Sequence, residues 1–109
     1  MSSKLLLVNN ASELTTLKDV NDRVVVMFSA SWCGPCKMIK PRIEEMSADS
    51  EIKFVYVDLE SFQDEEHKYK RFVTSMPTFF FYYKGLIINQ VIGANKNKIE
   101  EAVNSLSTR

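Results

Sequence analysis

The sequence predicts an α/β protein with a mixed sheet of about five strands and helices on both of its faces. Two continuous apolar runs, 23–28 and 53–57, are typical of strands that are covered on both sides. The stretch 36–47 between them has apolar residues at helical spacing, which predicts a β-α-β unit with parallel strands. The segment 78–92 holds two more apolar runs separated by a Lys-Gly turn, and it predicts an antiparallel hairpin.

The N-terminal part adds one strand and one helix to this core. Residues 4–8 predict the first strand. Residues 12–20 predict a helix that is capped by Ser12, with Leu14 and Leu17 facing inward. This helix would precede the first of the two central strands.

The remaining helices differ in how clearly the sequence predicts them. The central helix has an apolar stripe of Cys36, Ile39, Ile43 and Met46. Residues 63–72 are a charged stretch with a weaker helical pattern. Asn95 is the expected cap of the last helix, whose stripe consists of Ile99, Ala102, Val103 and Leu106. The predicted order of elements is β-α-β-α-β-α-β-β-α.

Length and charge limit the organisation of the protein and its class of partner. A chain of 109 residues predicts one globular domain over 1–109. Such a domain buries about 65% of its unfolded surface and needs no metal or disulfide to support its core. Lys plus Arg equals Asp plus Glu, at 14 each, so no nucleic-acid partner is predicted. The apolar run 5–8 is too short for a signal peptide or a membrane span, so we expect a cytosolic or nuclear protein without a membrane partner.

The candidate reactive groups are the two cysteines of the stretch Trp32-Cys33-Gly34-Pro35-Cys36. In a reducing compartment, a C-x-x-C pair indicates metal binding or redox catalysis more than a structural bridge. The pair lies where a central strand ends and a helix begins, which is where open α/β sheets collect reactive groups. Free N–H groups and the helix dipole stabilise a thiolate there, so Cys33 is the predicted nucleophile. Gly34 and Pro35 constrain the loop, and Cys36 is the predicted resolving thiol.

A structural disulfide and a structural zinc site are the alternatives to redox catalysis by the cysteine pair. A disulfide across four residues would stabilise the fold by only about 1.9 kcal/mol in the chain-entropy model, less than a longer loop would gain. A structural zinc ion needs four ligands, and besides the two cysteines the chain offers only His67 as a nitrogen or sulfur ligand. His67 lies in a charged run and is more simply a solvated side chain, so no metal site is predicted.

A series of short motifs extends from the cysteine stretch along nearly the whole chain. It consists of Phe28-Ser29-Ala30-Ser31, Trp32 to Lys37, Pro41, Ser75-Met76-Pro77-Thr78, Lys84-Gly85 and Gly93-Ala94-Asn95-Lys96. Together these motifs resemble the thioredoxin family, in its eukaryotic cytosolic form. The resemblance implies a thioredoxin-like fold and a protein-disulfide reductase that uses the Cys33-Cys36 disulfide and no bound cofactor. It also implies disulfide-containing protein substrates, a thioredoxin reductase as electron donor, and a monomer.

The same resemblance implies a substrate groove around the cysteines. Pro77 would be a cis proline packed beside Cys33, and the Met76 backbone and the Gly93 turn would grip an extended peptide of the substrate. Trp32 lies beside the reactive thiol on an exposed loop, so we expect it to face the substrate as well. The residues alone leave simpler roles open. Pro77 could only start a strand, and Met76 could be a core methionine. Gly93 could be only a turn at the end of a strand, and Trp32 could be a packed aromatic ring.

The sequence departs from the family pattern behind the cysteines. The family usually carries a buried Asp six residues before the first cysteine, where this chain has Met27, and the partner position on the neighbouring strand is Tyr56. The missing carboxylate eases ionisation of Cys33 but removes a general base for Cys36. We therefore expect slower resolution of mixed disulfides than in relatives that have the acid. The segment 58–77 is also slightly longer than usual, and a solvated helix is the simpler explanation of its charged run.

Two other functions were weighed against protein-disulfide reduction. The main alternative is a binding or assembly subunit in which the thioredoxin-like surface matters and the thiols are incidental. A dedicated oxidase or isomerase is the second, but such relatives tend to carry other residues between the cysteines and to enter the secretory pathway. Gly34-Pro35 and the absence of a signal peptide argue for reduction.

Overall fold

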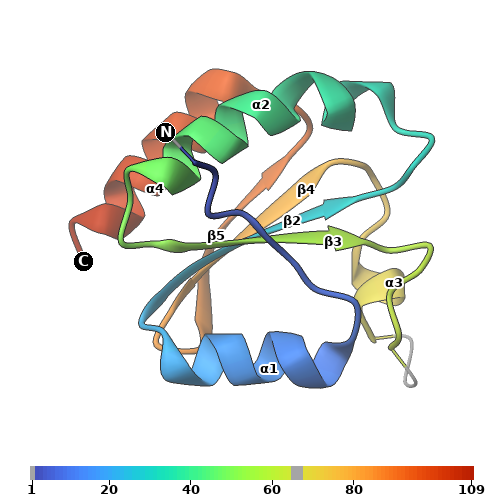
Figure 1. Ribbon diagram of the computed structural model, residues 1–109, viewed down its shortest axis with the longest axis horizontal. Helices are drawn as coiled ribbons and strands as arrows, with labels where there is room; N and C mark the ends of the chain where they lie inside the picture. The colour runs from blue at the N-terminus through green and yellow to red at the C-terminus, as the bar shows by residue number, and fades with distance from the viewer. Residues whose placement is uncertain (1, 65–67) are drawn as a thin grey trace.

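A mixed sheet of five strands forms the centre of the protein (Figure 1). The computed structural model describes residues 2–64 and 68–109. The elements are β1 (Leu6–Leu7), α1 (Ala11–Val20), β2 (Arg23–Ser29), α2 (Gly34–Ala48), β3 (Lys53–Asp58), α3 (Lys68–Phe72), β4 (Thr78–Tyr83), β5 (Leu86–Ile92) and α4 (Lys96–Ser107). The strand order is β1-β3-β2-β4-β5. Strands β1, β3 and β2 are parallel, whereas β4 is antiparallel to β2 and to β5, which confirms the predicted mixed sheet.

Helices cover both faces of this sheet, as predicted. In Figure 1, α2 and α4 lie on one face, and α1 and α3 lie on the other. Successive side chains of a strand point to opposite faces. Val25 and Met27 of β2 therefore pack into the core cluster under α2 and α4, whereas Val24, Val26 and Phe28 pack into the cluster on the α1 side. This two-sided burial explains the continuous apolar run of the strand.

The hairpin and the last helix agree with the prediction. Lys84 and Gly85 take positive φ angles of 51° and 84°, which a tight two-residue hairpin turn requires. Asn95 caps α4, because its side chain accepts a hydrogen bond from the backbone N–H of Lys98 at 3.1 Å. The whole predicted stripe of α4 is buried, namely Ile99, Ala102, Val103 and Leu106.

The cap of α1 differs from the prediction. The capping residue is Asn10 and not Ser12, since the Asn10 side chain accepts a hydrogen bond from the backbone N–H of Glu13 at 2.8 Å. Asn10 also forms a parallel bridge with Gln63, which lies more than fifty positions away in the chain. That distant contact fixes where α1 begins, and no local pattern reveals it. The predicted inward positions are confirmed, because Leu14 is buried and Leu17 packs against the same cluster.

The bounds of two further elements, β1 and α2, differ from the prediction. The first strand spans only Leu6–Leu7 instead of 4–8. The central helix begins at Gly34 rather than at position 36, because Cys33 itself occupies the capping position. The helix ends at Ala48, one residue beyond the predicted end.

The stretch 63–72 shows the largest difference. Lys68–Phe72 is helical, whereas Gln63, which the prediction placed in the helix, forms the bridge to Asn10. The carboxylate of Asp64 accepts a hydrogen bond from the backbone N–H of Tyr69 at 2.7 Å. The prediction of a solvated His67 concerns residues 65–67, which lie outside the described residues.

Candidate active site

Cys33 and Cys36 lie at the N-terminal end of α2, which places them at the end of β2, as predicted. Cys33 is the capping residue, and its Sγ accepts a hydrogen bond from the backbone N–H of Cys36 at 3.2 Å. The two sulfurs form a disulfide, with Cα atoms 5.3 Å apart. Pro35 lies in the first turn of the helix, where its missing N–H leaves no carbonyl without a partner. The helix N-terminus therefore presents N–H groups and its positive dipole end to the Cys33 sulfur.

The loop before the cysteines is tied to the end of β3. Both the backbone N–H and the hydroxyl of Ser31 donate to Glu60 Oε1, at 3.0 Å and 2.6 Å. These hydrogen bonds favour the ionised carboxylate, the hydroxyl bond most, and so lower the pKa of Glu60. The sequence analysis did not single out Glu60. Its position in the sequence could have revealed it, because Glu60 follows β3 and Ser31 follows β2. The C-terminal ends of neighbouring parallel strands meet at one edge of a sheet.

Pro77 and Gly93 lie together beside the cysteine loop. The Met76-Pro77 peptide bond is cis, as the family resemblance implies. Thr78 pairs with Phe28 near the end of β2, so Pro77 borders the loop that follows β2. The backbone N–H of Gly93 donates to the Pro77 carbonyl at 2.8 Å, and Gly93 has a φ of +95°, which favours glycine.

Trp32 and Met76 line one shallow pocket of about 320 Å³. Trp32 is 70% exposed, which excludes the alternative of a packed core aromatic ring. Met76 is half-buried and packs against both core clusters, so it has a core contact as well as a place at the pocket. The other lining residues are Ala30, Leu59, Glu60, Lys70 and Val73. The structure thus places Trp32 and Met76 at one pocket and joins Gly93 to Pro77 by a hydrogen bond.

Behind the cysteines, the predicted pairing of Met27 with Tyr56 is present. The two residues are register partners on β2 and β3, and Met27 is fully buried in the cluster that holds Cys36. The Tyr56 hydroxyl donates to Ser29 Oγ at 2.9 Å. The sequence analysis did not identify Ser29, although it follows Met27 on the same face of β2.

No group of three or more His, Cys, Asp or Glu side chains that could hold a metal ion occurs among residues 2–64 and 68–109. Within the same residues, no helix has the length and apolar character needed to cross a membrane.

A cysteine pair that closes into a disulfide at a helix N-terminus can take up and return two electrons by exchange with another disulfide. This is the chemistry of a thiol–disulfide oxidoreductase, and comparison with known proteins gives the same class. The chain belongs to the thioredoxin family, whose model matches residues 5–105. It is a protein-disulfide reductase with the thioredoxin-like fold, and its redox-active group is a disulfide.

Individual relatives agree with this assignment. Human thioredoxin is 46% identical over 84 residues, which cover 76% of this chain and 78% of the human protein. Thioredoxin H2 of Arabidopsis thaliana is 41% identical over 91 residues, which cover 83% of this chain and 67% of that protein. Among solved structures, reduced Schistosoma mansoni thioredoxin has a TM-score of 0.84 at 35% identity and covers 95% of this chain and 99% of its own. The thioredoxin NaTrxh of Nicotiana alata has a TM-score of 0.85 at 29% identity, and the match covers 98% of this chain and 96% of that protein.

Proposed function

We propose that Cys33 attacks substrate disulfides and that Cys36 resolves the mixed disulfide. The observation that carries this assignment is the capping position of Cys33, whose Sγ already accepts a backbone N–H bond in the disulfide form. The same N–H and the helix dipole stabilise a thiolate at Cys33, whereas Cys36 lies within the first turn and not at the capping position.

Reduction of one substrate disulfide by the dithiol form balances by itself, and an outside reductant must then return the Cys33-Cys36 disulfide to the dithiol before the next cycle. The Cys33 thiolate forms a bond to one sulfur of the substrate disulfide, and the other substrate sulfur leaves as a thiolate. Cys36 then loses its proton and attacks Cys33 Sγ, which breaks the mixed disulfide and releases the second substrate thiolate. Two electrons pass to the substrate, its two thiolates take up protons, and the Cys33-Cys36 disulfide remains.

We propose that Gly34 and Pro35 tune this exchange by holding the two sulfurs on one short loop. Pro35 has no N–H and a fixed φ, so it fits the first helical turn without a lost hydrogen bond. Gly34 has no atom within 4 Å of where a Cβ would be, so a larger residue is sterically possible there and its role lies in loop conformation.

An extended segment of a protein substrate is the proposed ligand of the groove formed by Trp32, Met76, Pro77 and Gly93. The exposure of Trp32 next to Cys33 in the chain and the hydrogen bond between Gly93 and Pro77 support this. Met76 precedes the cis bond, and its backbone is the proposed partner of a strand added by the substrate.

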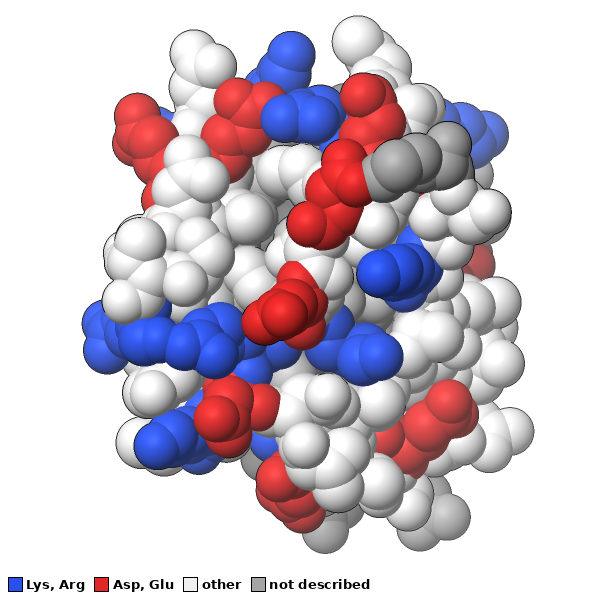
Figure 2. Space-filling view, turned by 60° about the vertical axis from the view of Figure 1, so that its left-hand side comes forward, with Lys and Arg blue, Asp and Glu red and all other residues white. Residues whose placement is uncertain are grey.

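We further infer one domain over 1–109 that works as a monomer in the cytosol or nucleus and takes electrons from a thioredoxin reductase. A reducing compartment supports such a cycle, since it regenerates the dithiol. On the face in Figure 2, acidic side chains lie above, below and across a band of Lys and Arg, a mixture that suits protein substrates better than nucleic acid or a membrane surface. This cycle requires no bound cofactor. The protein acts as an electron carrier, because it passes electrons from the reductase to its protein substrates.

Reduction of insulin disulfides by the dithiol-loaded protein tests the assignment. Cys33→Ser should abolish turnover, whereas Cys36→Ser should still attack and accumulate a mixed disulfide that mass spectrometry detects. Full activity of Cys33→Ser would overturn the roles. A partner complex that forms equally well without either cysteine would favour the binding-subunit alternative.

A further inference from the structure

Four buried polar side chains occur in the described part of the chain, and Ser29 differs from the others. Ser47, Asp64 and Thr78 each have a backbone group as partner. Ser29 is fully buried, and its hydroxyl is bound only by the hydroxyl of Tyr56, at 2.9 Å. That bond leaves the Ser29 hydroxyl hydrogen without an acceptor among the described residues, and buried donors are rarely left so. We call Tyr56 and Ser29 the hydroxyl pair.

The hydroxyl pair lies on the face of the sheet that carries the resolving cysteine. Ser29 follows Met27 by two positions on a regular strand, so both side chains point to the same face. Met27 and Cys36 share one core cluster, and Tyr56 packs against it. Asp64 is the one carboxylate among the four buried polar side chains of the described residues, and it binds the backbone of Tyr69, whose side chain belongs to the core cluster on the opposite face of the sheet.

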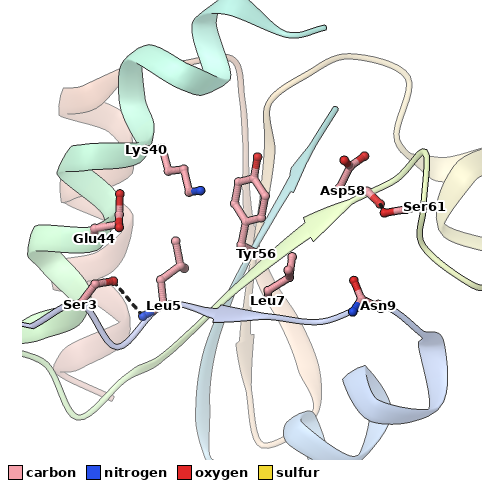
Figure 3. Close-up of a pocket in the computed structure, with 9 residues that line it drawn as sticks. All are labelled: Ser3, Leu5, Leu7, Asn9, Lys40, Glu44, Tyr56, Asp58 and Ser61. Atoms are coloured by element: carbon pink, nitrogen blue, oxygen red, sulfur yellow. Dashed lines mark hydrogen bonds between the residues drawn. The ribbon is translucent and has the colours of Figure 1, made fainter. Parts of the chain in front are cut away.

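The other end of the hydroxyl pair reaches a pocket of about 300 Å³ on the molecular surface. Figure 3 shows Tyr56 rising from β3 into this pocket, between Lys40 on one side and Asp58 on the other. The titratable groups that face Tyr56 are Lys40 and Glu44 from α2 and Asp58 from β3. Lys40 Nζ lies 4.5 Å from the centroid of the Tyr56 ring, which holds the ring in place by a cation–π contact.

We propose that the hydroxyl pair carries the proton of the Cys36 thiol to the pocket during resolution of the mixed disulfide. This inference rests on the proposed roles of Cys33 and Cys36. Hydroxyl hydrogens rotate, so Ser29 can accept the proton while it donates its own to Tyr56, whose hydrogen passes to water in the pocket. The Cys36 lone pair then forms the bond to Cys33, and the departing substrate thiolate takes a proton from solvent.

Tyr56→Phe is the sharpest variant, because it keeps the ring and its contact with Lys40 and removes only the hydroxyl. Stopped-flow fluorescence of Trp32, the single tryptophan, would follow reduction of a cyclic peptide disulfide. The rate of attack by Cys33 rises with peptide concentration. At saturating peptide the observed rate reaches a plateau, which is set by resolution of the mixed disulfide. We expect the plateau rate at pH 7 to fall about tenfold, less than the about 10²- to 10⁴-fold of a direct general base because water substitutes in part. The pH profile of the plateau should shift upward by about one unit.

Ser29→Ala should produce the same loss, and the double variant should lose little more, since both residues act in one pair. Tyr83→Phe is the matched control, because Tyr83 pairs with Arg23 at the opposite end of the sheet. Glu44→Gln should retain most of the plateau rate if the hydroxyl pair carries the proton.

Several outcomes would overturn the proposal. They are a Tyr56→Phe plateau and pH profile equal to those of wild type, a loss in Tyr56→Phe that affects attack and resolution equally, or a Glu44→Gln defect as large as that of Tyr56→Phe. Failure of the proposed function is seen separately: wild type would then show no concentration-dependent attack phase, or Cys36→Ser would not stop at the mixed disulfide.

Discussion

Glu60 joins the loop in front of Cys33 to the end of β3 through its two hydrogen bonds from Ser31. The bonds require the ionised carboxylate and lower its pKa from the ordinary value of 4.5. A carboxyl group with a lowered pKa in the folded state stabilises that state above its ordinary pKa. The contribution is lost as the pH falls through the lowered value. Because the carboxylate is exposed, the effect on stability is small and screened by salt.

Replacing Glu60 with Gln should lower the thermal unfolding midpoint slightly at pH 7. The difference from wild type should shrink as the pH falls below 4.5, where the wild-type carboxylate becomes protonated. Differential scanning calorimetry from pH 7 to pH 3 measures this difference. Glu101→Gln, an exposed position on α4, is the matched control and should show no such dependence. A Glu60→Gln difference that stays constant over this range would contradict the role of the charge.

Met27→Asp tests the consequence of the apolar residue behind the cysteines. A carboxyl group at this fully buried position has its pKa raised by burial and should destabilise the fold by roughly 2 kcal/mol or more. It should also speed resolution of mixed disulfides by about 10²-fold at most, the low end for a general base. Urea unfolding and stopped-flow decay of the mixed disulfide measure the two effects. Met27→Asn matches the shape without the acid, and an unchanged or slower decay in Met27→Asp would refute the expectation.

Helices α1 and α4 begin in the same way, with an asparagine side chain that accepts a hydrogen bond three residues on. Asn10 binds the N–H of Glu13, and Asn95 binds the N–H of Lys98. Each satisfies one of the N–H groups that a helix N-terminus leaves free. In α2 the capping position is occupied by Cys33, whose sulfur is a weaker hydrogen-bond acceptor than an asparagine oxygen. The helix with this weaker cap is the one that carries the reactive cysteines.

Loss of the α1 cap should be measurable by urea denaturation. Asn10→Ala should lower the free energy of unfolding by about 1 kcal/mol, because the Glu13 N–H loses its acceptor. Ser12→Ala should change it by much less, since the Ser12 side chain is exposed and is not the cap. Equal losses in the two variants would contradict the assignment of Asn10.

The whole molecule is held together by two core clusters on the two faces of one sheet. One contains Ile43, Phe79 and Leu106, and the other contains Leu14 and Phe28. The Cys33-Cys36 disulfide closes a loop of only four residues at the edge of the first cluster. The fold therefore rests on apolar burial and tolerates both redox states, which a cycling reductase requires.

The oxidised protein should be more stable than the reduced protein by at most about 2 kcal/mol. Urea denaturation with and without dithiothreitol measures this difference, and circular dichroism should show the same fold in both states. The Cys33→Ser/Cys36→Ser variant should fold and should not respond to dithiothreitol. Unfolding of the protein on reduction would show that the disulfide is structural.

Much of this protein follows from short-range patterns in its sequence. The continuous runs of β2 and β3, the Lys84-Gly85 turn and the Asn95 cap could be predicted because apolar periodicity, φ preference and capping act over a few residues. The place of the cysteine pair followed in the same way, because a strand-to-helix junction is a local feature. The cis bond at Pro77 and the groove came from resemblance rather than from such patterns.

Other features depend on residues that are far apart in the chain and meet only when it folds. Asn10 caps α1 because Gln63 holds it, Glu60 anchors Ser31 because two parallel strands end side by side, and Tyr56 reaches Ser29 across neighbouring strands. The sequence specifies where Cys33 and Cys36 lie along the chain and which chemistry they perform. The packed sheet specifies which polar groups surround them, because hydrogen bonds act over about 3 Å of space whatever the separation along the chain.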